Sequence, residues 1–147
     1  MKHPQSSIFR QLLIDADFLN ESSDSEWPSF ISSMPDGETV VSNCAALYDT
    51  PGLGDGRLMS TGENIIHFGV MIHVRSDDYM LGWDKLNDIC QYAETVKNCL
   101  VIVESSSYNV VNIRQSSNQY SLGQEKTTKR REIFGCNFLL TVKEAIE

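Results

Sequence analysis

The segment IIHFGVMIHV, residues 65–74, is the feature that most constrains the fold of this chain. Its side chains alternate, and successive side chains of a β-strand point to opposite faces of a sheet, so the pattern predicts a strand with one buried face. A strand of this kind needs neighbouring strands beside it and another layer over its apolar face. The residues expected on that face are Ile66, Phe68, Val70, Ile72 and Val74.

Helical patterns lie on both sides of this strand in the sequence. Ser6 or Ser7 is predicted to cap a first helix, because apolar residues recur at three- and four-residue steps over residues 8–19. A second helix is predicted to open at Asp77 or Asp78 and to run to about residue 97. Its buried face is expected to carry Tyr79, Trp83, Leu86, Cys90, Ala93 and Val96.

Further strands are predicted from runs of β-branched and aromatic residues. These runs are ETVVSNCAALY (38–48), CLVIVES (99–105), YNVVNIRQ (108–115) and EIFGCNFLLTV (132–142). Two polar stretches separate elements: NESSDSEWPS (20–29) is expected to be an acidic linker whose end docks on the body, and 116–131 a long exposed hairpin loop. The sequence thus predicts an α+β fold, a mostly antiparallel β-sheet packed by two helices on one face. We expect one domain over residues 1–147, with the N-terminal helix and acidic linker in 1–29 and the body in 30–147.

The stretch YDTPGLGDG, residues 48–56, resembles the element with which GTPases sense a phosphate. Such enzymes also need a loop of the form G-x-x-x-x-G-K-[ST] to wrap the phosphates, and no Gly-Lys-Ser or Gly-Lys-Thr occurs in the chain. The stretch is therefore predicted to be a strand end and its loop, in which Pro51 and the glycines at 52, 54 and 56 form a turn.

Other catalytic and metal-binding patterns are also missing from the sequence. There is no G-x-S-x-G elbow, and His67 and His73 on one strand would lie roughly 20 Å apart, too far to share a metal ion. The four cysteines occur in apolar stretches without a C-x-x-C pair, so we interpret them as small buried hydrophobic residues. We expect no enzymatic activity, no cofactor and no metal.

Charge is distributed unevenly along the chain, whose formal net charge is -8. Residues 1–63 carry ten acidic residues against three basic ones, whereas residues 114–131 carry five basic residues against Glu125 alone. An acidic chain does not bind nucleic acid through neutralisation of phosphates. The two segments of opposite charge are candidates for contact surfaces, although the same charges can also be ordinary solvated side chains.

No apolar run approaches the roughly 20 residues that a membrane-spanning helix needs. The first residues place Asp15 and Asp17 within the apolar pattern and lack a small-residue cleavage site, so we expect no signal peptide. We therefore expect assembly in the cytoplasm and no membrane partner.

Three segments, taken together, resemble a family of tailed-bacteriophage minor capsid proteins whose fold is similar to that of phage tail terminators. They are MPDGETVVSNCAALYDTPG (34–52), FGVMIHVRSDDYMLGWDKLNDICQYAETV (68–96) and NIRQSSNQYSLGQEKTTKRREIFGCNFLLTV (112–142). In the last of these Arg-Gln, Leu-Gly, Arg and Asn-Phe follow in the order of the family. The resemblance covers about residues 30–142 and does not include the acidic linker.

The resemblance implies a structural part of the virion rather than an enzyme. Its members are expected to form a ring, a hexamer, in the neck between the head connector or stopper protein and the tail tube protein. Such a ring ends tail growth and mediates head–tail joining, and DNA passes through its lumen without specific binding. A head-completion or stopper subunit, a cytosolic adaptor of the same fold and a small hydrolase with a site between subunits remain alternatives.

A ring is assembled head to tail, so each subunit needs two different complementary surfaces. The acidic and basic segments of the sequence are the candidates for them. The residues predicted to form this assembly interface are Arg114, Lys126, Lys129, Arg130 and Arg131 on the basic side and Asp49 and Asp55 on the acidic side.

Overall fold

The computed structural model of the chain describes residues 2–35, 41–57, 64–124 and 130–144, with the backbone alone at 53–57, 64, 65 and 144. Within these residues the elements follow in the order α1 (Gln5–Asp15), β1 (Ser29–Ile31), β2 (Cys44–Arg57), β3 (Asn64–Ser76), α2 (Tyr79–Thr95), β4 (Lys97–Val103), β5 (Ser106–Gln115), β6 (Tyr120–Gln124) and β7 (Glu132–Glu144).

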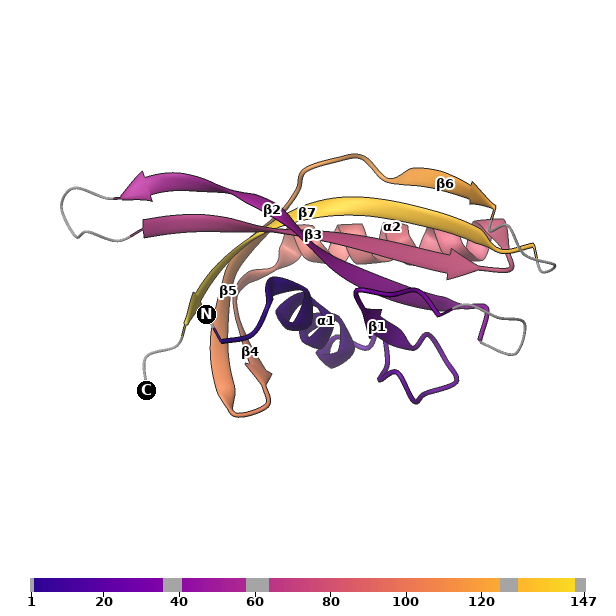
Figure 1. Ribbon diagram of the computed structural model, residues 1–147, viewed down its shortest axis with the longest axis horizontal. Helices are drawn as coiled ribbons and strands as arrows, with labels where there is room; N and C mark the ends of the chain where they lie inside the picture. Colours follow the sequence, from indigo (N-terminus) through magenta and orange to yellow (C-terminus); the bar gives the residue numbers. More distant parts are fainter. Residues whose placement is uncertain (1, 36–40, 58–63, 125–129, 145–147) are drawn as a thin grey trace.

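The strands form one curled sheet in the order β1-β2-β3-β7-β5-β4 (Figure 1). β5 and β6 lie along the same edge of β7. β6 pairs with residues 132–135 of β7, and β5 pairs with residues 138–144. β1 runs parallel to β2, and the other pairings in the described part are antiparallel. This arrangement confirms the predicted α+β class.

Both helices cover the same face of the sheet. Phe134 and Phe138 point to one face of β7 because they are four residues apart, and the ring of Phe138 packs on Phe9 of α1 with centroids 5.2 Å apart. Trp83 of α2 makes an edge contact with Phe134 at 5.6 Å. The core between these layers is apolar, and α1 contributes Ile8, Phe9, Leu12 and Leu13 while α2 contributes Leu86, Ile89, Cys90 and Ala93.

The alternation that predicted β3 is confirmed over most of its length. Val70, Ile72 and Val74 are fully buried, whereas Ile66 is 40% exposed. The difference follows from pairing: β7 lies beside β3 from His67 onward, and within the described residues Ile66 pairs with β2 alone. A two-stranded ribbon cannot bury its faces by itself.

The predicted start of the first helix is wrong. The N-cap is Pro4, which has no side-chain capping bond, and Ser6 lies buried in the first turn. The cap comes from another element, since Asp49 of β2 accepts a hydrogen bond from the Ser6 backbone N–H at 2.9 Å. The Gln5 side chain also donates to the Gly69 carbonyl at 3.1 Å, so the helix begins where the sheet holds it.

The turn predicted after Tyr48 is also wrong, because β2 continues to Arg57. The register between β2 and β3 shifts between Thr50 and Leu53 and again between Gly54 and Gly56. Pro51 lies within the first shift, where the ladder of backbone hydrogen bonds is interrupted. Gly52 is needed for close packing rather than for a left-handed turn: a Cβ on it would collide with the carbonyl oxygen of His67.

The long loop predicted over 116–131 contains an unpredicted strand, β6, paired with β7. The Tyr120 ring lies where a Cβ on Gly135 would be, so the absence of a side chain on β7 makes room for it. Apolar periodicity could not predict this strand, because Tyr120 and Leu122 are its only large apolar residues.

The second helix begins as predicted. Asp78 is its N-cap, and its carboxylate accepts hydrogen bonds from the Met80 and Leu81 backbone N–H groups at 3.1 and 3.3 Å. Of the cysteines, Cys99 is half-buried and the other three are buried, which confirms most of the prediction for them.

The acidic linker, residues 20–29, is a loop closed at its base. The Asn20 backbone N–H donates to the Trp27 carbonyl at 2.9 Å, and the Ser29 N–H donates to the Asn20 carbonyl at 3.0 Å. Trp27 packs against the core, as predicted, and the Lys85 ammonium lies 5.1 Å from its ring centroid. The exposed residues 21–26 therefore project from an anchored base.

Candidate assembly surfaces

The basic interface candidates that the structure describes, Arg114, Arg130 and Arg131, do not form one continuous patch. Arg114 is exposed on β5, and Arg130 is exposed just before β7. Arg114 pairs with Leu139 of β7, whereas Arg130 lies just before Glu132, where β7 begins. Leu139 and Glu132 are seven residues apart, so the two ends of the basic segment lie roughly 23 Å apart at about 3.3 Å per residue. Lys126 and Lys129 lie outside the described residues.

Arg131 differs from Arg114 and Arg130 because its side chain is fully buried. A buried guanidinium presents no charge to a partner while the subunit keeps this conformation. Replacing it by a carboxylate would disturb the interior as well as the surface.

The two acidic candidates both lie on β2. Asp49 is exposed yet bound to the start of α1, where a carboxylate also favours the helix dipole. It faces the helix side of the sheet, since it pairs with the buried Val70, whereas Arg114 belongs to the other face through its partner Leu139. The side chain of Asp55 is outside the described residues. The structure thus does not bring Asp49 and Arg114 together.

A buried arginine that the sequence analysis did not single out holds the segment before β2. Arg75, at the end of β3, donates hydrogen bonds from its guanidinium to the backbone carbonyls of Pro35, Val41 and Ser42, the last two at 2.9 and 3.4 Å. These carbonyls belong to the first of the three family-like segments, and Arg75 belongs to the second. Arg75, at the end of β3, therefore fixes the chain that leads into β2, its neighbour in the sheet.

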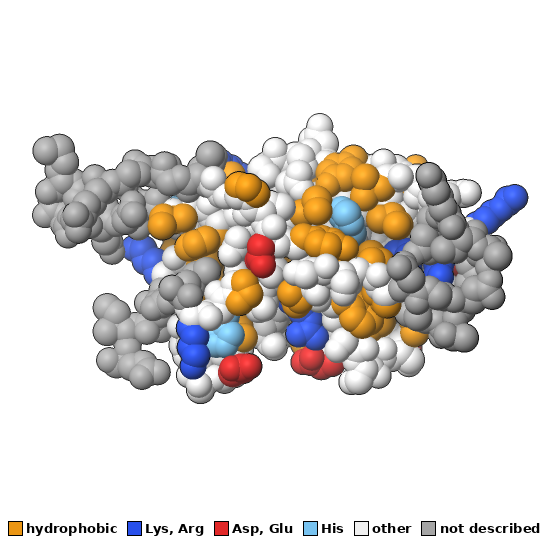
Figure 2. Space-filling view, in the orientation of Figure 1, with side chains coloured by type: hydrophobic (Ala, Val, Ile, Leu, Met, Phe, Trp, Pro, Cys, Tyr) orange, Lys and Arg blue, Asp and Glu red, His pale blue; other side chains and the backbone are white. Residues whose placement is uncertain are grey.

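The sheet face away from the helices is also partly apolar. Figure 2 shows hydrophobic side chains gathered around a histidine on the side of the molecule that Figure 1 presents. On this face Tyr48 and His73 are cross-strand neighbours of β2 and β3 with ring centroids 5.0 Å apart, and both are half-buried. Burial lowers the pKa of His73 below its ordinary 6.5, which favours the neutral ring.

Strongly exposed apolar side chains gather at two places in the described part of the chain. The helix-end patch consists of Tyr79, Met80 and Leu81 in the first turn of α2, which are 50%, 56% and 44% exposed. The edge-strand patch consists of Leu100 and Ile102 of β4, which are 60% and 54% exposed. The sequence carried a signal for both, because consecutive apolar residues in a helix or a strand cannot all face the same core.

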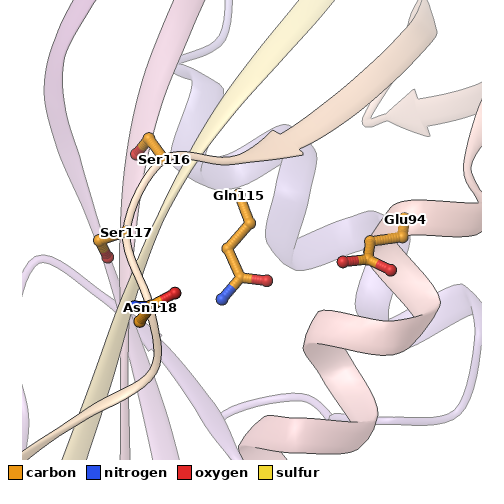
Figure 3. A pocket seen from close by; sticks show the side chains of 5 residues that line it. All are labelled: Glu94, Gln115, Ser116, Ser117 and Asn118. Carbon is orange, nitrogen blue, oxygen red and sulfur yellow. The ribbon is translucent and has the colours of Figure 1, made fainter.

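A polar recess of about 470 Å³ lies between the last turns of α2 and the chain after β5. Figure 3 shows the Gln115 amide pointing into this space, with the Glu94 carboxylate across from it and Ser116–Asn118 along the other wall. The wall is fixed to β7, since the Asn137 N–H donates to the Ser117 hydroxyl at 3.0 Å. These lining residues offer one carboxylate and several neutral groups, with no base beside a nucleophile.

The histidines have partners that suit a structural role. His3 contacts the Tyr108 hydroxyl at 2.7 Å and the Glu104 carboxylate at 3.3 Å, which ties the start of the chain to the β4–β5 hairpin. His67 lies 2.7 Å from the hydroxyl of Thr141, its cross-strand partner. Within the described ranges no group of three His, Cys, Asp or Glu side chains could hold a metal ion, and no helix there is long and apolar enough to cross a membrane.

Comparison with known proteins gives a likeness of fold. No protein-family model matches the sequence, and no curated protein sequence matches it. A chain in the virion of a native gene transfer agent (GTA) particle superimposes with a TM-score of 0.57 and 9% identity, over 97% of this chain and 96% of that chain. A second solved chain, 11% identical, covers 97% and 95% of the two chains but reaches a TM-score of only 0.47, too low to support an argument. At 9% identity, the first likeness shows a shared fold.

Proposed function

We propose that this chain is a structural protein of a phage-like virion and that it acts in the neck as a tail terminator. Copies of the chain form a ring, a hexamer, between the head connector or stopper protein and the tail tube protein. The ring ends tail growth, joins head to tail and leaves a lumen through which DNA passes. The observation that carries the proposal is the fold shared with a virion chain over nearly the whole length of both proteins.

Two further features support the proposal. The three segments that resemble phage minor capsid proteins fall on the elements that build the sheet, and Arg75 connects two of them through hydrogen bonds. The net charge of -8 suits a ring around DNA, because an acidic lining repels phosphates and lets the duplex move without binding. Assembly takes place in the host cytoplasm, and the finished protein stays in the virion.

The decisive experiment removes the gene from its phage and images the particles by electron microscopy. A terminator is needed to stop tail growth, so its loss gives tails of irregular length beside unjoined heads full of DNA. Restoring the wild-type gene on a plasmid should restore joined particles with tails of uniform length. Particles that remain normal without the gene would refute the proposal.

The same images separate the terminator from a head-completion or stopper subunit. Loss of a stopper leaves the tails uniform in length, because tail growth still ends normally, while the heads lose their DNA. An antibody or gold label on the chain gives an independent location. A label found on isolated tails supports the terminator, and a label confined to isolated heads supports the stopper.

A further inference from the structure

The helix-end patch and the edge-strand patch lie well apart on the molecule (Figure 1). Helix α2 has 17 residues, so its axis is about 25 Å long at 1.5 Å per residue. The helix-end patch is at its first turn, and β4 begins directly after its last turn and leads further away, as Figure 1 shows. One subunit therefore presents two separate apolar surfaces that cannot contact each other.

The edge-strand patch lies on the last strand of the sheet. β4 is the last strand of the sheet and pairs with β5 alone, so its other edge has no strand neighbour in the described part of the chain. Proteins blunt such edges with charges, proline, very short strands or a covering helix, and the apolar run CLVIV (99–103) itself has no charge and no proline, although Lys97 precedes it in β4 and α1 packs near β4. Val101 is buried toward the core, which turns Leu100 and Ile102 together to the other side.

The helix-end patch is preceded by two acids, whereas the edge-strand patch is bordered by two lysines and one acid, the exposed Glu104 directly after β4. Asp77 and Asp78 directly precede the helix-end patch, and both are exposed. Lys97 is exposed at the start of β4, and Lys143 of β7 lies in the same cross-strand row as Leu100, through Asn109. Opposite charges around two apolar centres favour one orientation of contact over the others.

From these features we infer that the helix-end patch of one copy packs against the edge-strand patch of the next copy. The occupant is a second copy of this chain, because both halves of the contact, one preceded by two acids and the other bordered by two lysines and one acid, are present on separate surfaces of the same subunit. Such a contact is heterologous: it repeats from copy to copy and closes into a ring when the rotation between copies allows it. The inference deepens the proposed function and rests on it for the place of the ring in the particle.

The test uses two full-length variants, each of which damages one patch. Met80→Asp/Leu81→Asp removes the helix-end patch, and aspartate in a first helical turn suits the helix dipole. Leu100→Asp/Ile102→Asp removes the edge-strand patch, and Leu100→Thr/Ile102→Thr repeats the test with side chains that strands accept. Ile66→Asp on β3, which is 40% exposed in the wild type and belongs to neither patch, is the matched control. Thermal melts confirm that each variant is folded.

Sedimentation velocity then measures self-association of each protein alone and of a mixture. The wild type and the control should self-associate with similar strength, and each patch variant alone at least tenfold more weakly. Mixing the two patch variants should produce a complex of one copy of each, because one intact helix-end patch then meets one intact edge-strand patch. No larger species should form, since the other two patches are damaged.

Three results would overturn the inference. They are a wild type that stays monomeric at about 1 mM, a helix-end variant that self-associates as well as the wild type, and a mixture that yields no 1:1 complex. The second of these would mean that β4 edges pair with each other or that the helix end serves another protein.

Complementation separates this inference from the proposed function. If the patch variants join heads to tails as well as the wild type in a phage that needs the gene, the inference fails and the neck role stands. If the variants lose self-association as expected but the phage does not need the gene for joining, the contact stands and the neck role fails.

Discussion

Leucine, isoleucine and tyrosine occupy two kinds of region in this molecule, the layer between the helices and the sheet and the two exposed patches at the start of α2 and on β4. In the central layer, Ile72 of β3 and Leu86 of α2 are fully buried. In the patches, Leu100 and Met80 are more than half exposed although they belong to elements of the same kind. The same residue type therefore stabilises the subunit in one region and is available for a partner in the other.

The largest difference between the regions should appear on introducing a charge in β3. We expect Ile72→Asp to prevent soluble folding, because an unpaired buried carboxylate costs several kcal/mol against a total stability of about 5–15 kcal/mol. Ile66→Asp on the same strand is the control, since Ile66 is 40% exposed and should tolerate the change. Soluble yield and a cooperative thermal melt distinguish the two. A stable Ile72→Asp protein would show that this face is not the core.

The next effect concerns the buried arginine at the end of β3. Arg75→Met should lower the free energy of unfolding by about 3 kcal/mol, because the carbonyls that Arg75 binds lose charge-assisted hydrogen bonds. Arg114→Met, at an exposed position of β5, should change it by less than about 0.5 kcal/mol. Urea unfolding followed by tryptophan fluorescence measures both. Equal effects from the two arginines would contradict the role given to Arg75.

A smaller effect is expected at the contact between β2 and α1. Asp49→Ala removes the acceptor of the Ser6 N–H and should lower the free energy of unfolding by about 1 kcal/mol, the usual value of a helix cap. Asp84→Ala, an exposed acid within α2, provides the comparison and should have little effect. If the change at Asp49 leaves stability unchanged but weakens assembly, then Asp49 acts at an interface rather than as a cap.

The smallest effect is a pH dependence from the outer face of the sheet. Burial lowers the pKa of His73 in the folded state below 6.5, so the unfolded chain binds the proton more tightly. The contribution of a neutral His73 is therefore complete above pH 6.5 and is lost as the pH falls below that value. A His73→Gln variant should show a shallower loss of stability between about pH 6.5 and 5 in urea titrations. An unchanged slope would show that His73 does not titrate differently on folding.

Local patterns in the sequence were sufficient for the elements with a clear period. The alternation in β3 and the helical face of α2 follow from repeats of two and of three to four residues, and the structure confirms them except at Ile66 and Tyr79, which are 40% and 50% exposed; the cap at Asp78 is also confirmed. The α+β class could be predicted because such elements can only be packed as a sheet with helices over its apolar face.

The failures occurred where a residue's role depends on a partner far away in the sequence. Asp49 caps α1 from 43 residues away, and Gly52 fits against a carbonyl of β3. β6 forms because Gly135 of β7 leaves room for Tyr120. Arg131 is buried despite its position in a basic segment. A one-dimensional pattern contains none of these contacts.

By itself, the sequence determined the elements that have a clear apolar period and the class of fold they build, because the period of apolar side chains is a local property of the chain. Only the tertiary structure decided which apolar residues remain exposed, since burial depends on which elements lie beside each strand. β7 covers β3 from His67 onward, whereas the outer edge of β4 has no strand beside it in the described chain. For that reason the helix-end patch and the edge-strand patch, rather than the run of basic residues, are the surfaces to test for assembly.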